Sequence, residues 1–433
     1  MRITLRLLAA TAAVVLCATT PPAAASADPG RHAAGPYPQF LYRGENRVNP
    51  LETTLTRDDV SQLTLLWTHS TGSLNVFAAP VVDRDMVFEG EYRCCPAPSR
   101  IEAFDGGTGS LLWTFSTPAP VVAAAAVHKG VVFAGDYNGT LDALHERTGD
   151  LLWSGDAGGQ VFDPDNVTVH GSRVFTVGIT PGIDGPSRLS AWNVAGCGAQ
   201  TCEPLWTASF DTGVGPGPAV VGNTVYVASD AGWLYALRAS GCSAPACDPL
   251  WRAKFPAPGA SNVFQGLAVA RGLVYVGNGS SSVVDVFPAA GCGAPTCKPL
   301  WSYDAGPAQP GGLAIVKRKL YAGTAAGLAA YPARCRMGSV CTPVWLDSSA
   351  PATTHLLVAN RVVYATFGTT LLADDASTGD RLWQVSTPDP CQAPTVADGV
   401  VYCASTFADE ILAFGLPAVS RAHRSRARPR GRA

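Results

Sequence analysis

The chain has 433 residues, with 31 Lys and Arg against 33 Asp and Glu. Eight of the positive charges lie in the first six and last fourteen residues, so the body between them carries 23 positive against 33 negative charges. An acidic body excludes nucleic acid as the expected partner. The 45 Gly and 34 Pro residues favour short strands and tight turns over helices.

The first 27 residues have the pattern of a secretory signal peptide. Arg2 and Arg6 precede an apolar stretch at residues 7–19, and a run of small residues ends at Ala27. This pattern predicts cleavage and export of a mature chain that begins at Asp28. The apolar stretch is too short to span a membrane, and no later segment reaches the roughly 20 apolar residues that a span requires. We therefore expect a secreted, extracellular protein without a membrane span.

The mature chain divides into three parts. Residues 28–62 form a lead-in, residues 63–416 carry a repeated pattern, and residues 417–433 form an Arg-rich tail that is predicted to be disordered. This tail either adheres to an anionic cell-wall polymer or is solvated and has no role, and the sequence is compatible with both. The repeats predict one large ring, and we expect a monomer.

One unit recurs along residues 63–416. An apolar strand, a Gly-containing turn and two further short strands lead to an outer strand that contains Leu-Trp. The intervals between successive tryptophans are 46, 40, 53, 45, 50, 44 and 38 residues. A period near 45 with four strands per unit is typical of a β-propeller. The tryptophans that mark the outer strands are Trp67, Trp113, Trp153, Trp206, Trp251, Trp301, Trp345 and Trp383.

The two ends of the repeated region complement each other. The last unit stops after its third strand at residues 411–414, while residues 63–67 supply an outer strand before the first complete unit. Pairing these two segments would close the ring and leave no open sheet edge. The sequence therefore predicts an all-β propeller of eight four-stranded antiparallel blades, with seven blades as the alternative.

A family resemblance follows from the turn before the outer strand. Residues 103–113 and 373–383 both read A-x-D-x-x-T-G-x-x-x-W, and residues 143–153 differ only by His145 in place of Asp. This pattern resembles the tryptophan-docking motif of quinoprotein alcohol dehydrogenase propellers. The resemblance implies that each tryptophan stacks between neighbouring blades. It also implies pyrroloquinoline quinone (PQQ) and calcium as conceivable cofactors.

Eight cysteines occur as pairs in the loops before four outer strands. The spacing of five or six residues lets each pair bridge facing strand ends. Zinc would need two such pairs to converge, and each pair belongs to a different blade. We expect the structural disulfides Cys197–Cys202, Cys242–Cys247, Cys292–Cys297 and Cys335–Cys341.

Four further cysteines remain in the mature chain: Cys94, Cys95, Cys391 and Cys403. They lie in the first and last blades, which the closed ring makes neighbours, and four cysteines allow three pairings. One pairing contains a Cys94–Cys95 bridge, which the family resemblance associates with a cofactor. The other two would cross-link the blades at the point of ring closure.

Propellers bind ligands at the mouth of the central channel, where the loops into the inner strands meet the loops between second and third strands. The sequence places Glu91, Arg93, Cys94, Cys95, Asn262, Gln265 and His355 at this mouth as candidate cofactor-binding residues. The oxygen-rich cluster Asp163, Asp165 and Asn166 could bind calcium, or could be ordinary turn chemistry. No catalytic residue can be named.

Two functions are compatible with these features. The first is a secreted, non-catalytic propeller that binds an extracellular ligand or protein. Its basis is the compact set of repeats and the dense disulfides. The second is a small PQQ- and calcium-dependent dehydrogenase that oxidises alcohols or sugars, based on the docking motifs and on Cys94-Cys95. The chain has no Cys-x-x-Cys-His haem attachment motif, so such an enzyme would pass its electrons to an external acceptor.

Overall fold

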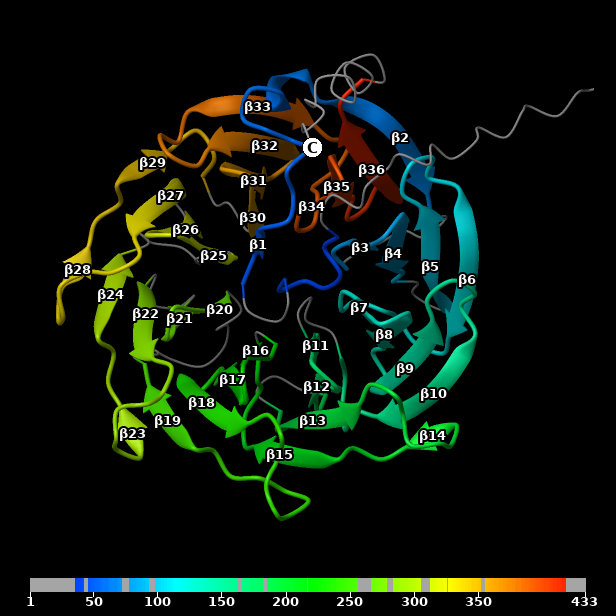
Figure 1. The fold of residues 1–433 in the computed structure, drawn as a ribbon, viewed down its shortest axis with the longest axis vertical. Coiled ribbons are helices and arrows are strands. Elements are labelled where there is room, and N and C mark those ends of the chain that lie inside the picture. The colour runs from blue at the N-terminus through cyan, green and yellow to red at the C-terminus, as the bar shows by residue number, and fades with distance from the viewer. Residues whose placement is uncertain are drawn as a thin grey trace, which may run out of the picture. The chain divides into compact units, whose positions relative to one another are not determined.

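A computed structural model describes residues 36–42, 46–71, 78–92, 98–161, 166–181, 185–215, 217–255, 266–278, 283–304, 312–324, 326–351 and 355–417. Within these residues the strands form eight antiparallel sheets arranged as a ring (Figure 1). The inner strand of each sheet contacts the inner strands of both neighbours, all the way around. The predicted eight-bladed propeller is confirmed, and the alternative of seven blades is wrong.

The strands of blades 1 to 4 are, from the inner strand outwards, β3 (Val81–Asp83), β4 (Met86–Gly90), β5 (Ser99–Asp105) and β6 (Leu111–Thr117); β7 (Ala126–His128), β8 (Val131–Gly135), β9 (Thr140–His145) and β10 (Leu151–Asp156); β11 (Val167–His170), β12 (Arg173–Ile179), β13 (Ser187–Asn193) and β15 (Trp206–Phe210); and β16 (Ala219–Val221), β17 (Thr224–Ser229), β18 (Trp233–Arg238) and β19 (Trp251–Lys254).

Blades 5 to 8 follow the same order: β20 (Leu267–Ala270), β21 (Leu273–Asn278), β22 (Val283–Pro288) and β24 (Trp301–Asp304); β25 (Leu313–Val316), β26 (Lys319–Thr324), β27 (Gly327–Pro332) and β29 (Trp345–Asp347); β30 (His355–Ala359), β31 (Val362–Phe367), β32 (Thr370–Asp375) and β33 (Arg381–Ser386); and β34 (Thr395–Ala397), β35 (Val400–Ala404), β36 (Glu410–Gly415) and β2 (Thr64–Ser70). The other elements are short: β1 (Val48–Asn49), β14 (Thr201–Cys202), β23 (Thr296–Cys297), β28 (Val340–Cys341) and the 3-10 helix η1 (Val60–Gln62).

The ring closes as the sequence predicts. Strand β2, which precedes blade 1, pairs antiparallel with β36 and becomes the outer strand of blade 8, with Leu65 opposite Phe414. The first and last repeats therefore share one sheet. Closure pairs the edge strand of the incomplete last repeat, which would otherwise be open to another chain.

Six of the eight blade junctions contain a contact between a tryptophan and a glycine among the described residues. The Trp67 ring of blade 8 lies so close to Gly109 of blade 1 that a Cβ on that glycine would come within 2.6 Å of Trp67 Cε3. Trp113 and Gly149 repeat this arrangement between blades 1 and 2. The same contact occurs where a cysteine loop replaces the Thr-Gly turn, because Gly196, Gly241 and Gly291 each precede the first cysteine and lie against a tryptophan of the preceding blade.

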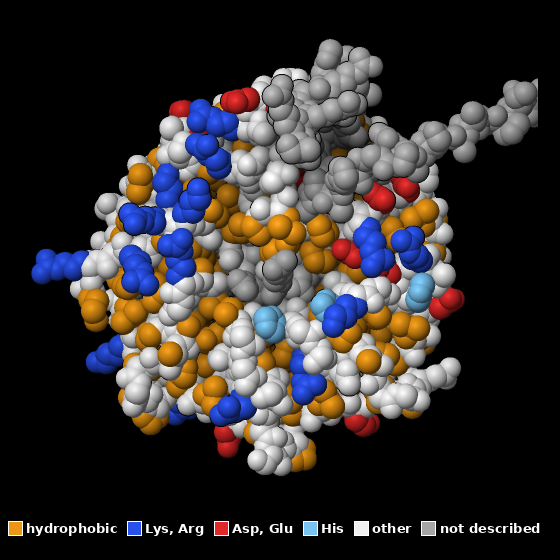
Figure 2. All heavy atoms as spheres, viewed as in Figure 1, with side chains coloured by type: hydrophobic (Ala, Val, Ile, Leu, Met, Phe, Trp, Pro, Cys, Tyr) orange, Lys and Arg blue, Asp and Glu red, His pale blue; other side chains and the backbone are white. Residues whose placement is uncertain are grey.

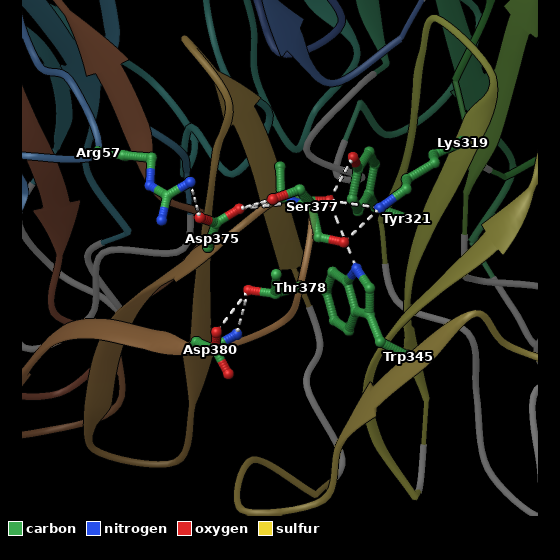
Figure 3. A network of polar contacts seen from close by, with 9 residues as sticks. Arg57, Lys319, Tyr321, Trp345, Asp375, Ser377, Thr378 and Asp380 are labelled. Atoms are coloured by element: carbon green, nitrogen blue, oxygen red, sulfur yellow. Dashed lines mark hydrogen bonds and ion pairs between the residues drawn. The ribbon is translucent and has the colours of Figure 1, made fainter.

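The junction between blades 6 and 7 shows how the polar groups of this contact are satisfied (Figure 3). The carbonyl oxygen of Ala376 accepts hydrogen bonds from Trp345 Nε1 at 3.4 Å and from Tyr321 Oη at 2.8 Å. Asp375 accepts a hydrogen bond from the Ser377 amide at 2.7 Å and pairs with Arg57 at 2.8 Å. The Asp of the motif thus shapes the turn that presents the carbonyl oxygen to the tryptophan.

Candidate functional site

The ring has two faces, which we name by their connections. The loop face carries the loops that enter the inner strands and the loops between second and third strands. The turn face carries the turns between first and second strands and the connections from third to fourth strands. The sequence places the candidate site on the loop face, at the mouth of the central channel.

Most of the candidate residues on the loop face lie outside the described residues: Arg93, Cys94, Cys95, Asp163, Asp165, Asn262 and Gln265. The structure describes Glu91, Asn166 and His355, which belong to blades 1, 3 and 7. It does not bring these three into one cluster. In the described part of the chain, no three His, Cys, Asp or Glu side chains are placed to hold a metal ion.

Glu91 is buried next to the boundary between blades 8 and 1. Its carboxylate accepts two hydrogen bonds from Arg100, at 3.0 Å from Nε and 3.1 Å from Nη2. The same guanidinium donates to the carbonyl oxygen of Thr71 in the strand segment that closes the ring, and pairs with Glu102 at 3.4 Å. Glu91 therefore holds a cation of its own blade in place.

A second buried carboxyl group lies beside this network. Glu89 on β4 faces Glu102 across the strand pair, and within the described residues neither Glu89 carboxyl oxygen has a hydrogen-bond partner. Burial, together with the negative charge of Glu102, raises the pKa of Glu89 well above its usual range. The two carboxyl groups are therefore expected to share a single negative charge. A charged residue inside the apolar strand Met86–Gly90 was a signal for this pair that the sequence interpretation did not use.

The central channel is occupied by the lead-in, which no sequence pattern indicated. Tyr37 exchanges two 2.8 Å backbone hydrogen bonds with Val82 of blade 1, and the Val127 amide of blade 2 donates to the Pro38 carbonyl oxygen at 2.7 Å. Gln39 Oε1 accepts a 2.8 Å hydrogen bond from the Val169 amide of blade 3. The lead-in thus joins the inner strands of three blades.

The same segment then reaches the opposite side of the channel. Strand β1 pairs in parallel with β30 of blade 7, with Val48 opposite Val358, and it lies at the centre of the ring (Figure 1). Asn49 Nδ2 donates to the carbonyl oxygen of Val396 in blade 8 at 2.8 Å, and the Arg47 amide donates to Leu313 of blade 6 at 3.4 Å. Residues 36–42 and 46–49 together contact the inner strands of six blades.

Arg47 is the polar centre of this segment. Its side chain is 1 % exposed and donates to three backbone carbonyl oxygens, of Leu356 at 3.0 Å, Phe40 at 2.9 Å and Pro394 at 2.7 Å. The guanidinium also lies 4.1 Å above the ring of Phe40. A buried cation is tolerated when its donors are satisfied in this way. The sequence offered no signal for this role, because the two acceptor blades lie more than 300 residues further along the chain.

His355 opens strand β30, and its ring contacts that of Phe40 with 6.1 Å between centroids. Burial and the positive charge of Arg47 lower the pKa of His355 to about 4. The imidazole is therefore neutral at physiological pH. It is a packing partner of the lead-in in this structure.

Asn166 lies immediately before β11 and is fully buried. Neither its side-chain oxygen nor its nitrogen has a hydrogen-bond partner among the described residues. Its expected calcium partners, Asp163 and Asp165, lie outside the described residues. The calcium site therefore stays a prediction.

The four cysteine pairs in the blade loops are disulfides in the structure, as expected. A fifth disulfide links Cys391 to Cys403 within blade 8. The expected alternative of cross-links between blades 8 and 1 is therefore wrong, because both cysteines of blade 8 are already paired with each other. Adjacent antiparallel strand segments bring these two residues together, with 5.7 Å between their Cα atoms. Cys94 and Cys95 lie outside the described residues.

The ring of eight four-stranded blades, with its tryptophan docking, defines a PQQ-like β-propeller. The family model described as "Outer membrane protein assembly factor BamB" matches residues 97–196, 190–335 and 342–418. The chain belongs to this family. No curated protein matches its sequence significantly.

Solved structures share the fold at low sequence identity. BamB from Moraxella catarrhalis is 14% identical with a TM-score of 0.60, over 82% of this chain and 99% of that chain. Quinohemoprotein alcohol dehydrogenase from Comamonas testosteroni is 14% identical with a TM-score of 0.67, over 89% and 81% of the two chains. The computationally designed Ika8 protein is also 14% identical, with a TM-score of 0.62. At this identity the likeness shows the fold alone. Among the described residues, no helix of the length and apolar character needed to span a membrane is present.

Proposed function

We propose that this protein is an exported, non-catalytic propeller that acts as a scaffold for an extracellular ligand or protein. The observation that carries the proposal is the lead-in inside the channel. Its residues contact six inner strands, and the Arg47 side chain is bound by three of the protein's own carbonyl oxygens. A channel built around its own chain serves to hold the ring together.

Two described cations, Arg47 and Arg100, do not fit the role of a cation beside a quinone cofactor. PQQ carries carboxylates and needs a cation near the quinone. Arg47 is held by backbone carbonyl oxygens, and Arg100 by Glu91, Glu102 and Thr71. Releasing either guanidinium would leave buried acceptors without donors, which is costly. These two cations therefore stabilise the propeller itself.

Export and protein binding have independent support. The five disulfides among the described residues favour an oxidising compartment, in agreement with the predicted signal peptide. The family is described as an assembly factor, which is a protein-binding role. We propose that this protein has a protein-binding role outside the cell.

The alternative is a small PQQ- and calcium-dependent dehydrogenase, and one observation favours it. The Cys391–Cys403 disulfide leaves Cys94 and Cys95 with each other as the remaining partners within the mature chain. A Cys94–Cys95 bridge is the feature that the quinoprotein resemblance associates with a cofactor. In this alternative, calcium would be held by Asp163, Asp165 and Asn166.

Calorimetric titration of the mature, oxidised protein with PQQ separates the two functions. The titration is carried out with and without calcium, and is followed by an assay of alcohols and sugars with an artificial electron acceptor. We expect no calcium-dependent binding and no turnover. Tight calcium-dependent binding that is lost in Asp163→Asn/Asp165→Asn, together with turnover, would overturn the proposal and establish the enzyme.

A further inference from the structure

Basic residues are concentrated in one part of an otherwise acidic protein. Residues 266–350, which form blades 5 and 6, contain seven Lys and Arg but only three Asp and Glu. Of these three, Asp285 is buried, while Asp304 and Asp347 end the outer strands β24 and β29 and so lie at the loop face. The turn face of these blades therefore carries positive charge without acidic neighbours from the same blades.

Six of these basic residues, all except Lys298, form one surface together with Arg361 of blade 7. Arg271 of blade 5 and Arg334 of blade 6 both act electrostatically on the Tyr275 hydroxyl, which donates to the carbonyl oxygen of Ala333 at 2.9 Å. The Ala333 amide in turn donates to the carbonyl oxygen of Arg318 at 2.7 Å, which places the backbone of Arg318, in the first turn of blade 6, beside that of Arg334.

The surface continues from blade 6 to blade 7. Lys319 Nζ donates to the carbonyl oxygens of Ala376 at 3.0 Å and Ser377 at 2.7 Å, and the Ala376 amide donates to the Arg361 carbonyl oxygen. Figure 2 shows the Lys and Arg side chains gathered on the side of the ring where blades 5 to 7 lie. We call this surface the basic patch; it consists of Arg271, Lys317, Arg318, Lys319, Arg334, Arg336 and Arg361.

The charges of the basic patch are available to a partner. All of its members except the partly buried Lys319 are exposed. In the described part of the chain, none of the seven forms an ion pair. Arg57, which lies nearby on the lead-in, pairs with Asp375 and is not counted in the patch. The patch therefore has an uncompensated charge, whereas Arg100 and Arg381 elsewhere are neutralised by carboxylates.

Three members of the patch occupy backbone conformations that favour other residues. The φ angles of Arg271, Lys317 and Arg361 are +54°, +54° and +70°. Gly, Asn or Asp would adopt this left-handed region at lower cost. The same conformation occurs at Arg84 and Lys129 of blades 1 and 2, at φ +53° and +51°, so it is a feature of the turn between the first and second strands rather than of the patch.

The Arg-rich tail begins on the same face. Strand β36 runs from the loop face to the turn face and ends at Gly415, in the blade next to blade 7. The sequence that follows contains six arginines between residues 421 and 432. The described chain ends at residue 417, and these arginines lie outside the described residues.

We propose that the basic patch binds an extended polyanion with phosphodiester groups, of the kind carried by a cell-surface glycopolymer. This inference rests on the proposed scaffold function and names its partner class. Five of the seven members are arginines, whose planar guanidinium matches phosphate oxygens in pairs. A flexible single chain can follow the patch across three blades. A rigid duplex would extend past the patch onto the acidic remainder.

The test measures binding of full-length protein to an oligomer of glycerol phosphate as a function of sodium chloride concentration. The test variant is Arg271→Asn/Lys317→Asn/Arg334→Gln. Asparagine relieves the left-handed positions, so folding should be retained, and this is checked by thermal unfolding. The matched control Lys129→Asn/Arg147→Gln/Arg238→Gln also removes three exposed charges, including Lys129 at φ +51°, but from blades 2 and 4.

We expect affinity to fall with salt, because each phosphate contact releases counterions. The test variant should bind at least roughly tenfold more weakly, and its log–log salt slope should be shallower by about two, at ~0.7 per phosphate contact for a single chain. The control should stay within about twofold of the unmodified protein, which is the expectation for charges that contact no phosphate.

Four results would overturn the inference. They are no binding by the unmodified protein, equal weakening in the control, tighter binding of double-stranded DNA at the same charge concentration, and equal binding of polyglutamate. These results would leave the scaffold function standing, because the quinone titration tests that function separately. Quinone turnover with intact glycerol phosphate binding would remove the scaffold function and keep the patch.

Discussion

Replacement of Arg47 by methionine tests whether the lead-in holds the ring together. Methionine fills a similar volume without a donor, so the main loss is three charge-assisted hydrogen bonds to Leu356, Phe40 and Pro394. At about 1.5 kcal/mol net for each bond, and with part of the loss offset because the cation is no longer buried, we expect a decrease of about 3–5 kcal/mol in the free energy of unfolding.

Urea unfolding of the oxidised protein measures this loss, and Arg57→Met is the matched control. Arg57 belongs to the same lead-in, but its side chain is 46% exposed and forms one ion pair. Its replacement should cost no more than about 1 kcal/mol.

A second measurement is independent of global stability. Since the positive charge of Arg47 helps to lower the pKa of His355 to about 4, the pKa of His355 should rise in Arg47→Met. Titration of the imidazole followed by NMR would show this. A loss below about 1 kcal/mol together with an unchanged His355 pKa would refute the reasoning.

Three further predictions concern the blades. Burial raises the pKa of Asp142 to about 6, so its ionisation costs stability as pH rises from about 4 to 6; Asp142→Asn should therefore be more stable than the unmodified protein at pH 8, by up to ~3 kcal/mol, and similar at pH 4. Equal differences in melting temperature at both pH values would contradict this. Cys391→Ala/Cys403→Ala removes the disulfide that closes a loop between residues twelve positions apart, and should lower the free energy of unfolding, measured with a chemical denaturant, by about 3 kcal/mol. Peptide mapping that finds Cys391 linked to another cysteine would contradict this pairing. Gly109→Ala should lower the free energy of unfolding by about 2–4 kcal/mol, because the alanine would have both an unfavourable φ of +71° and a contact with Trp67. Gly171→Ala is the control: its φ is +63° but no atom lies near the new Cβ, so the loss should be about 1 kcal/mol. Equal losses in the two variants would argue against the docking contact.

The cations of the basic patch differ from Arg47 of the lead-in in burial and in their partners. Arg47 is a cation whose donors are used up inside the protein, so its contribution is structural. Arg271 and Lys317 are exposed cations that form no ion pair among the described residues, and the role proposed for them is to bind a partner outside the protein. The difference is one of burial and available partners, which sequence alone does not give for any single arginine.

The sequence determined the architecture. The recurrent Leu-Trp strands, the completion of the last blade by residues 63–67 and the close spacing of cysteines such as Cys197 and Cys202 are all local patterns. They predict correctly because each blade forms within about 45 residues, and because ring closure follows from one missing strand. Even the glycines that contact six of the docking tryptophans lie in motifs that can be read along the chain.

The tertiary structure alone decided what fills and surrounds the ring. Arg47 meets Pro394 across 347 residues, and Arg271 and Arg334 both lie near Tyr275 only because neighbouring blades place their turns side by side. The choice of Cys403 as the partner of Cys391 likewise depends on how two strand segments align. Apart from this disulfide, which lies within blade 8, these contacts join residues from different repeats or from the lead-in. They depend on the curvature of the closed ring, which no local sequence pattern contains.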